Sequence, residues 1–588
     1  MFDIPGLSMI VARLRRLQHS QLLVSVFGLP ELNNIIFSYL GQNDLVRWAR
    51  VSKKWHHTVI PYIWRDMSAL TESQYKRLAR MVINDYQRVH CHPPKMTGGQ
   101  QSSLVKYCPL IRKLGLASGQ NLICSTSLFQ FILMDLLDTI PSDDLVSKVP
   151  GIFRSFMAHC THLHALDLDI PHSRFYESVK VIADSAVQHL RHLSIHGSIF
   201  DCAFKYLIAR CPTTLETLEL SFTPIPSDKG LPVMEVGEVE QDPLSNLRRL
   251  TLRDCDGLSH EILLSSLWRR CESVEALELM RCYFTFHRLM PAIMETFLPN
   301  LNSISIEEDQ CRYKQGDEDL ARLLSGSRLG WRSVSIMGYV EFGERSWEAL
   351  SRHTSTLEKF EMAKWYHQDG VELRPFFTSF PKLQSFVTLA EKEVDYLKIN
   401  AIGSIDWIHR NPLSGSLTPW LCEYTLTDLR IKISGIPRPD VTHDHKGRKR
   451  RPLVEESYSG EGRMIQHRVY ERLARLVNLE VLCLGSNSYY FEYSATRLKK
   501  IPKRQYECLE MSLESGLDQL QGLKRLRVLN ISLMAAKVGQ KEAQWMAEQW
   551  PRLREIHGLT SRGDARSARQ WFKRKCPRVA TPLLSTKE

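Results

Sequence analysis

The sequence predicts an α/β fold in which a three-helix N-terminal module precedes a long repeat solenoid. Three observations lead to it: a unit of the form L-x-x-L-x-L recurs along the chain, its copies are evenly spaced, and cysteines and prolines keep a constant phase with it. Self-similarity at a period of a few tens of residues is the signature of stacked structural repeats. Such stacks place a curved parallel sheet inside and helices outside, and their concave surfaces bind partners.

The repeat can be followed over most of the chain. Its copies begin at Ile111, Leu163, Leu190, Leu215, Leu247, Val274, Leu301, Trp331, Leu357, Leu426, Leu479 and Leu526, with weaker copies at Leu383 and Leu553. From 163 to 383 the steps are 27, 25, 32, 27, 27, 30, 26 and 26 residues. This period is typical of leucine-rich repeats that contain one strand and one helix each.

Residues outside the strands keep the same phase. Three or four positions before the first leucine slot, several repeats carry a cysteine: Cys108, Cys160, Cys211 and Cys271. A small thiol and a proline suit the point where a helix turns into a strand. Because the cysteines follow the repeat and form no Cys-x-x-Cys pair, we interpret them as free core thiols of a reducing compartment and expect no metal and no cofactor.

The stretch from Leu29 to Trp64 carries three short helical patterns. Pro30 lies in a first helical turn, where its missing N–H costs nothing. Apolar residues then follow at helical spacing, at Leu32, Ile35, Ile36, Tyr39 and Leu40. Residues 41–44 break this helix, and Asn43 or Asp44 can cap the next one. A second apolar stripe comprises Leu45, Trp48, Ala49, Val51 and Trp55.

Some of this apolar surface should remain outside any core of the module itself. A domain of about forty residues shields too little surface to bury so many large side chains. Exposed apolar patches usually bind another protein. The alternative is a helical cap that packs wholly on the chain's own following domain, and the pattern alone leaves both readings open.

Five segments of this stretch carry a family resemblance: Leu29-Pro30-Glu31-Leu32, residues 36–40, Asp44-Leu45, residues 51–55 and Ile63-Trp64. In order and spacing they resemble an F-box, the module that docks on the Skp adaptor of SCF-type ubiquitin ligases, although the first helix opens one residue shorter than in the commonest form. The resemblance implies that the adaptor interface or its support includes Leu29, Pro30, Leu32, Ile36, Leu40, Leu45, Val51, Trp55 and Trp64.

An F-box followed by leucine-rich repeats is similar to the F-box and leucine-rich-repeat family over most of the chain. The resemblance implies a non-catalytic substrate receptor of an SCF-type ubiquitin ligase, which binds a Skp-type adaptor and, through it, a cullin scaffold. The solenoid would then capture a protein target. The alternative function is a repeat scaffold or adaptor that acts outside any ubiquitin ligase.

The domain boundaries follow from these patterns. We expect a helical or flexible segment at 1–25, the F-box at 26–66, the solenoid at 67–560 and a fraying basic tail at 561–588. The long step from Leu426 to Leu479 contains polar, aperiodic sequence, which predicts a disordered basic loop at 436–466. Its run Lys446–Arg451 is either a nuclear import signal or a solvated segment without a role.

Strand alternation predicts which residues face the concave side of the solenoid. The second and third leucine slots point into the core, so the residues between and beside them point the other way. The candidates for target binding are Asp167, Ser194, Glu219, Thr251, Glu278, Ser305, Ser335, Glu361 and Arg430. This surface mixes both charges and has no basic stripe, which favours a protein partner over nucleic acid.

Composition excludes several other classes of protein. The chain has 588 residues, 43% hydrophobic and 24% charged, with a net charge of +12. These values are typical of a globular protein with more than one core or a repeat array. We find no catalytic motif, no apolar run of ~18 residues that would span a membrane and no export signal, and therefore expect a cytoplasmic or nuclear protein. Nucleic-acid binding through 446–451 and 571–575 is a weaker hypothesis.

Overall fold

The computed structural model describes residues 35–37, 39–67, 74, 77–78, 80–85, 103–115, 152, 154–170, 189–197, 206, 208–222, 242–254, 267–282, 289–307, 316–366, 374–388, 397–398, 417, 419–431, 433–434, 458–484, 509–532, 537–559 and 563–582. The chain divides into two compact units, Met1–Gln241 and Asp242–Glu588. The predicted segment 1–25, the run Lys446–Arg451 and the rest of 436–457 lie outside the described residues.

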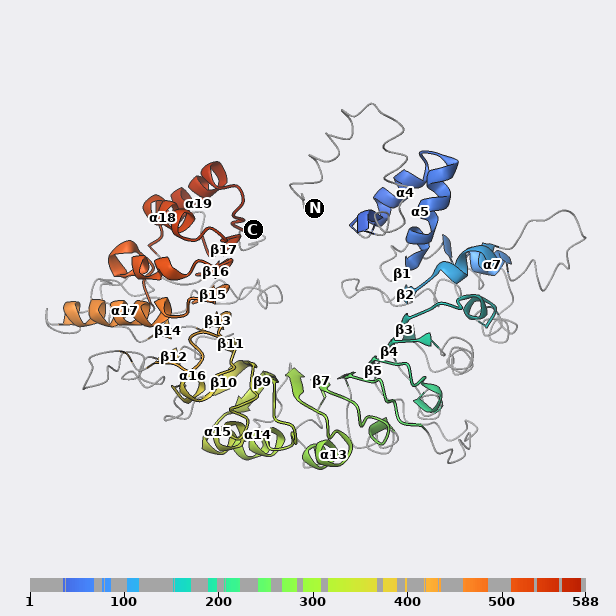
Figure 1. Cartoon of the computed structure of the whole chain (residues 1–588), viewed down its shortest axis with the longest axis horizontal. Helices are drawn as coiled ribbons and strands as arrows, with labels where there is room; N and C mark the ends of the chain where they lie inside the picture. The colour runs from blue at the N-terminus through green and yellow to red at the C-terminus, as the bar shows by residue number, and fades with distance from the viewer. Residues whose placement is uncertain are drawn as a thin grey trace, which may run out of the picture. The chain divides into compact units, whose positions relative to one another are not determined.

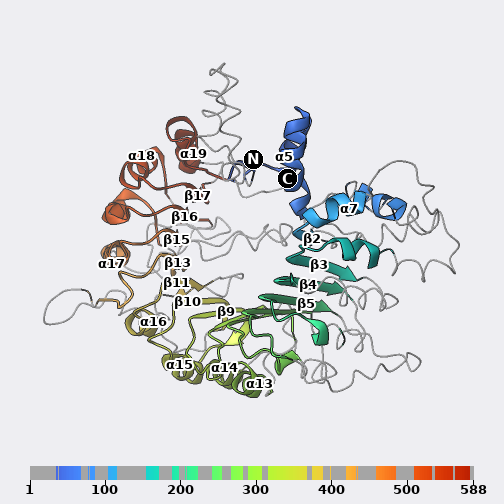
Figure 2. The ribbon, with the colours of Figure 1, turned by 45° about the vertical axis from the view of Figure 1, so that its right-hand side comes forward.

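The first unit begins with the helical module and continues into parallel strands. Ser52 caps the second of its helices, because its hydroxyl accepts a hydrogen bond from the backbone N–H of Trp55 at 3.2 Å. The helices are α4 (Gln42–Ala49), α5 (Lys53–Arg65), α7 (Ser103–Tyr107) and the 3₁₀ helix η1 (Cys108–Leu110). The strands pair in chain order and are β1 (Asp66–Met67), β2 (Lys113–Gly115), β3 (Ala165–Ile170), β4 (His192–Gly197) and β5 (Thr217–Phe222). Figure 2 shows β2 to β5 as successive parallel arrows.

The second unit contains a longer parallel sheet of the same kind. Its strands are β6 (Arg249–Arg253), β7 (Ala276–Met280), β8 (Ser303–Glu307), β9 (Ser333–Glu341), β10 (Lys359–Tyr366), β11 (Ser385–Thr388), β13 (Asp428–Arg430), β15 (Val481–Cys483), β16 (Val528–Asn530) and β17 (Glu555–His557). A two-stranded sheet joins β12 (Leu397–Lys398) to β14 (Ile433–Ser434).

Helices follow the strands of this unit and lie along one face of the sheet (Figure 1). They are α13 (Leu289–Phe297), α14 (Asp317–Leu324), α15 (Glu344–Ser351), α16 (Arg374–Ser379), α17 (Tyr458–Ala474), η7 (Leu513–Ser515), η8 (Leu517–Gly522), α18 (Gln540–Gln549) and α19 (Gly563–Lys575). The opposite face of the sheet is called the open face below. Among the described residues, no helix combines the length and the apolar composition needed to cross a membrane.

Strand register confirms the predicted repeat. In unit 1 the second leucine slots pair across neighbouring strands as Leu166, Leu193 and Leu218. In unit 2 the same position is occupied by Leu250, Leu277, Ile304, Val334, Phe360, Phe386, Leu429, Leu482, Leu529 and Ile556. All of them are buried, and burial of each such side chain contributes about 1.5–3 kcal/mol. The weak copies at Leu383 and Leu553 are therefore true repeats.

The repeat cysteines lie in the core, where the helices turn into the strands. Cys108, Cys160, Cys211 and Cys271 are all buried free thiols. A hydrogen bond with the Cys108 thiol, together with burial, raises the pKa of the Cys160 thiol well above its ordinary value. A thiol held in the neutral form behaves as a small apolar side chain.

Two sequence predictions about irregular segments are wrong in part, over residues 458–466 and 563–575. Helix α17 begins at Tyr458, inside the loop predicted at 436–466, and buries Val469, Tyr470 and Leu473 on one face. The tail predicted to fray at 561–588 contains α19, which packs on α18 and buries Ala568 and Phe572. The buried apolar residues of α17 lie just beyond position 466, and those of α19 are few among basic residues.

A buried ion pair also holds α17 in place. The guanidinium of Arg472 lies 3.5 Å from the carboxylate of Glu423 and stacks over the ring of Trp420, 5.1 Å from its centroid. Burial disfavours the charged form and lowers the pKa of Arg472 to about 10, while Glu423 opposes this shift. Sequence periodicity does not reveal such a pairing between residues 49 positions apart.

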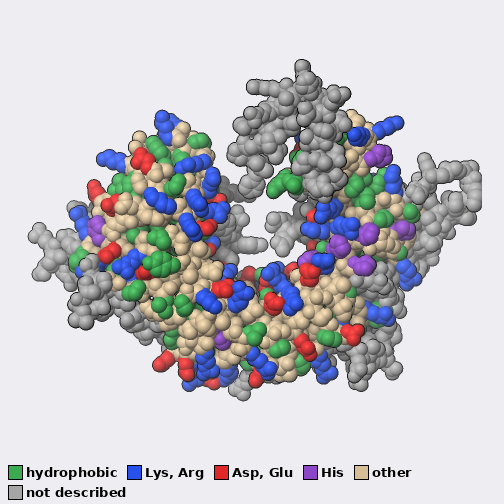
Figure 3. Space-filling model, viewed as in Figure 1, with side chains coloured by type: hydrophobic (Ala, Val, Ile, Leu, Met, Phe, Trp, Pro, Cys, Tyr) green, Lys and Arg blue, Asp and Glu red, His purple; other side chains and the backbone are tan. Residues whose placement is uncertain are grey.

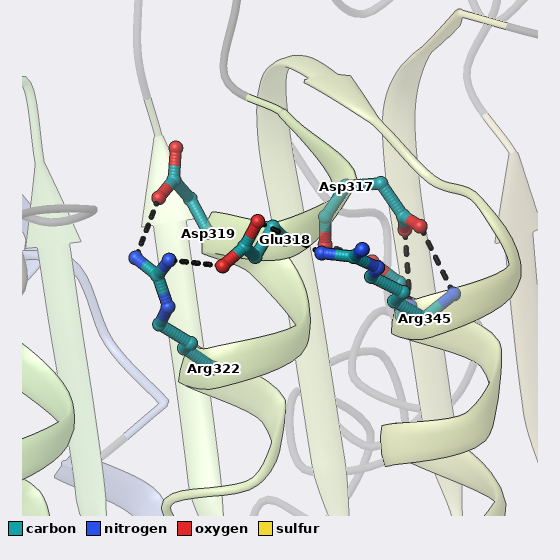
Figure 4. A network of polar contacts seen from close by, with 6 residues as sticks. Asp317, Glu318, Asp319, Arg322 and Arg345 are labelled. Carbon is teal, nitrogen blue, oxygen red and sulfur yellow. Dashed lines mark hydrogen bonds and ion pairs between the residues drawn. The ribbon is translucent and has the colours of Figure 1, made fainter.

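The helices of adjacent repeats are also joined by polar contacts (Figure 4). Asp317, at the start of α14, accepts hydrogen bonds from the backbone N–H groups of Gly343 at 2.6 Å, Arg345 at 2.9 Å and Ser346 at 3.0 Å. Its carboxylate thus caps the N-terminus of α15, where anionic groups are favoured. A Cβ atom at Gly343 would lie 2.6 Å from that carboxylate, so the glycine permits the close approach.

Glu318 extends this network across the surface. Its carboxylate pairs with Arg345 at 2.8 Å on α15 and with Arg322 on its own helix, and Arg322 also pairs with Asp319 at 3.1 Å. These side chains are exposed, and exposed ion pairs contribute little. The Asp317 cap is therefore the contact of this network that should matter most for stability.

We predict that Asp317→Asn lowers the free energy of unfolding by about 1–2 kcal/mol, because the amide replaces a carboxylate that accepts three N–H bonds. Burial alone would raise the pKa of Asp317, but the hydrogen bonds from Ser346, Gly343 and Arg345 outweigh it and lower the pKa below 3.8. The stabilisation is thus fully present above pH 3.8 and lost as the pH falls through the lower folded value.

Urea unfolding of the full chain at neutral and acidic pH measures this difference. Asp319→Asn is the matched control, because that carboxylate pairs only with Arg322 among the described residues. Equal unfolding midpoints for the two variants would contradict the capping role.

Candidate protein-docking surfaces

The helical module of unit 1 has a hydrophobic core of its own. The buried residues at its centre are Phe37, Leu45, Ala49 and Val59. The side chains packed against them are Ile36, Leu40, Trp48, Trp55, Tyr62 and Ile63. Every one of these residues belongs to the segment 36–63, so the module does not depend on the repeats for its centre.

Aromatic rings join the helices of this core edge to face. The centroids of Phe37 and Tyr62 lie 4.8 Å apart, and those of Trp48 and Trp55 lie 4.9 Å apart. Such pairs contribute about 0.5–1.5 kcal/mol beyond their burial. Trp55 therefore acts as a support of the module.

Three large apolar side chains of the module remain in solvent. Ile35 is 54% exposed, Tyr39 is 69% exposed and Val51 is 69% exposed. Ile35 and Tyr39 lie one helical turn apart, and Val51 lies in the turn between α4 and α5. They are three of nine exposed large hydrophobic residues among the described residues, although the segment 35–51 is short. Apolar surface is thus concentrated here.

The far end of the module packs on the first repeat. The ring of Trp64 stacks on Tyr107 with centroids 4.9 Å apart and an interplanar angle of 4°. The backbone N–H of Arg112 donates to the carbonyl of Arg65 at 2.9 Å. Because α5 leads directly into β1, which pairs with β2, the module is joined to the solenoid without a linker.

The residues predicted for the adaptor interface therefore fall into four groups. Leu29, Pro30 and Leu32 lie outside the described residues. The module core contains Ile36, Leu40, Leu45 and Trp55. Trp64 lies at the junction with the repeats, and Val51 is exposed. Sequence reasoning placed Ile35 and Tyr39 in the apolar stripe but missed their exposure, which depends on how the helices pack.

The open face of each sheet brings the predicted target-binding residues into register. In unit 1, Asp167 pairs with Ser194, which pairs with Glu219. In unit 2 the row runs through Thr251, Glu278, Ser305, Ser335 and Glu361. Val387 then separates Glu361 from Arg430.

Hydroxyl groups of this row hold carboxylates in place. Thr251 Oγ1 donates to Glu278 Oε2 at 3.1 Å, and Ser335 Oγ donates to Glu361 Oε2 at 3.1 Å. Thr251 is only 3% exposed and Ser335 only 7%, whereas both glutamates are half-buried. The glutamates are therefore better placed than the hydroxyls to contact a partner.

Opposite charges accompany most charged members of the row. Glu361 pairs with Lys359 at 3.1 Å, Arg430 with Asp428 at 2.9 Å, and Glu278 with Arg249 at 3.8 Å. The hydrogen bond from Arg430 to Asp428 raises the pKa of the arginine, although burial opposes this. Figure 3 shows positive and negative side chains intermixed along unit 2. The open face is thus a mixed polar surface.

We predict that Phe37→Ala destabilises the module by about 3–5 kcal/mol, because a buried ring leaves a cavity. Tyr39→Ala should change stability by no more than about 0.5 kcal/mol, because the ring is already in solvent. Hydrogen–deuterium exchange of α4 and α5 in the full chain measures the difference. Similar exchange in the two variants would show that the module core is not the one described.

Comparison with known proteins supports the interpretation of the module. The family of F-box-like domains matches residues 30–69. None of the curated proteins matches the sequence. A chain of the crystal structure of the Rad7 and Elc1 complex in yeast aligns with 73% of this chain and 85% of its own length, at 14% identity and a TM-score of 0.33. That similarity is too low to bear on function. Residues 30–69 thus match the F-box-like family, and the module that they form has a core of its own and precedes a leucine-rich-repeat solenoid whose leucine slots are in register.

Proposed function

We propose that this protein is the substrate-recognition subunit of an SCF-type ubiquitin ligase. Its F-box would bind a Skp-type adaptor, and through it a cullin scaffold, while the solenoid captures a protein target. The observation that carries the proposal is that Ile35, Tyr39 and Val51 are exposed, although the module has a hydrophobic core made of its own residues. Three exposed apolar side chains in one small module are typical of a docking surface.

The mechanism requires no catalytic residue in this chain. A receptor that binds both the target and the ligase raises the concentration of the target near the ubiquitin donor. The stacking of Trp64 on Tyr107 supports this role, because it fixes the module relative to the first strands of unit 1. A target bound on those strands would be held at a defined distance from the adaptor.

The open face offers the contacts for that target. We propose that Asp167, Ser194 and Glu219 in unit 1 contact the target, and that the half-buried side chains Glu278, Ser305, Glu361 and Arg430 do so in unit 2. Thr251 and Ser335 would act by positioning the two glutamates. The carboxylates in this row favour a protein over nucleic acid, because they repel phosphate groups.

Replacing Ile35 and Tyr39 together by Asp should reduce capture of the Skp-type adaptor by the full chain at least tenfold. A tenfold change in the dissociation constant corresponds to ~1.4 kcal/mol of binding free energy. Single side chains at the centre of an interface often contribute more than this. The matched control is Leu421→Asp with Tyr424→Asp, which replaces an aliphatic residue and a tyrosine of similar exposure, 54% and 74%, in unit 2. Equal capture by the two double variants would refute the docking surface.

The composition of the captured complex tests the ligase itself. Wild-type protein should recover the adaptor together with cullin and RING subunits, and Val51→Asp should weaken recovery of all three in parallel. Recovery of the adaptor without the cullin would instead favour a scaffold that acts outside a ubiquitin ligase.

A further inference from the structure

Just before the strands, neighbouring repeats present paired opposite charges. The residue that precedes one strand forms an ion pair with its counterpart on the next repeat, in the pairs Arg191–Glu216 at 3.3 Å, Arg248–Glu275 at 3.0 Å, Arg332–Glu358 at 3.0 Å and Glu480–Arg527 at 3.3 Å. Opposite charges across neighbouring strands are mildly stabilising, and like charges there are destabilising.

The last repeat departs from this pattern, because it carries a second arginine where an acidic partner for Arg527 would lie. Val528 pairs with Glu555, and the backbone N–H of Arg554 donates to the carbonyl of Arg527 at 2.8 Å, so these two arginines lie side by side. Two positions earlier in the same two repeats, the sequence has Arg525 and Arg552. We call Arg525, Arg527, Arg552 and Arg554 the arginine rim. Stability alone does not explain why Arg527 and Arg554 adjoin at a position where other neighbouring repeats pair opposite charges.

Three members of the rim are available for a partner. The side chains of Arg525, Arg552 and Arg554 are exposed and form no hydrogen bond or ion pair with the part of the chain that the structure describes. Only Arg527 pairs with a carboxylate, that of Glu480, and this contact is exposed and weak.

Two further cations flank the rim. Lys524 Nζ donates to the carbonyl of Gln549 at 2.9 Å, and Arg578 Nη2 donates to the carbonyl of Ala547 at 3.4 Å, both at the C-terminus of α18. These contacts give both side chains a structural role, since cations favour helix C-termini. Among described residues from 517 to 582, Lys and Arg outnumber Asp and Glu by thirteen to five. Figure 3 shows this gathering of positive side chains around α18 and α19.

We infer that the arginine rim binds a short acidic segment, rich in Asp and Glu, of the protein target. The inference rests on the proposed function, in which the solenoid captures a target. Guanidinium groups bind carboxylates through two parallel hydrogen bonds, and Arg525, Arg552 and Arg554 form no ion pair with the described residues. Such contacts would also speed association with the target at low salt.

The dimensions of the rim favour a peptide of few residues. Neighbouring strands lie about 4.8 Å apart, so the rim and its flanking cations extend over roughly 10–15 Å. An extended chain advances about 3.3 Å per residue, and four or five residues therefore cover this width.

The surroundings of the rim disfavour nucleic acid. Single-stranded nucleic acids bind through bases stacked on aromatic side chains as well as through their phosphates. Among the described residues from 517 to 582, none of the large hydrophobic or aromatic side chains is exposed.

Binding of fluorescent hexaglutamate to the full chain, measured by anisotropy at low salt, tests the inference. Arg552→Glu with Arg554→Glu should weaken binding at least tenfold, and added salt should weaken wild-type binding. The control is Arg328→Glu with Lys382→Glu, which makes the same change in net charge at exposed positions of unit 2. Lys382 occupies the repeat position of Arg552, directly after a proline.

An equal loss in the control variant would show that net charge alone causes binding, and would overturn the inference. Tighter binding of oligodeoxythymidylate than of hexaglutamate would overturn it in favour of nucleic acid. Capture of the Skp-type adaptor separates the two proposals: the rim variant should retain it, whereas Ile35→Asp with Tyr39→Asp should lose it and still bind hexaglutamate.

Discussion

The amount of apolar surface that three short helices can bury decides how this protein is organised. The helices of the F-box close a small aromatic core around Phe37 and pack one end, at Trp64, on the first repeat. The module cannot also bury Ile35, Tyr39 and Val51, which remain exposed to solvent. The same burial limit thus leaves the exposed residues that we propose as the docking surface, while Trp64 fixes the module on the first repeat.

The solenoid obeys a related constraint. Each strand must bury its leucine slots between the sheet and the helices, and strand alternation then turns the residues between them to the open face. Strand alternation alone is enough to produce rows of polar residues on that face. Most charged side chains in these rows form ion pairs within the same row or with a neighbouring row. The arginine rim departs from this pattern. Local departures from a structural rule are common at functional sites, which makes the C-terminal repeats the most informative part of the surface.

The sequence was sufficient to predict the repeat strands, because a leucine slot is recognised by type and spacing even at the weak copies Leu383 and Leu553. It did not predict the two-residue strands β1, β12 and β14, which carry no L-x-x-L-x-L unit. It was insufficient for α17 and α19, whose buried stripes are short and diluted by polar and basic residues. The site was predicted only in part. Periodicity placed Ile35 and Trp55 in apolar stripes, but which side chain enters the core depends on the packing of three helices. The burial of Thr251 and Ser335 likewise depends on neighbours that periodicity does not specify.

The central claim is that a partner covers apolar surface which the F-box cannot bury by itself. Hydrogen–deuterium exchange of the full chain, with and without a Skp-type adaptor, tests it most directly. We expect slower exchange at the amides of residues 35–51 in the complex and unchanged exchange in the strands of unit 2. Unchanged exchange at 35–51, or protection confined to the repeats, would contradict it.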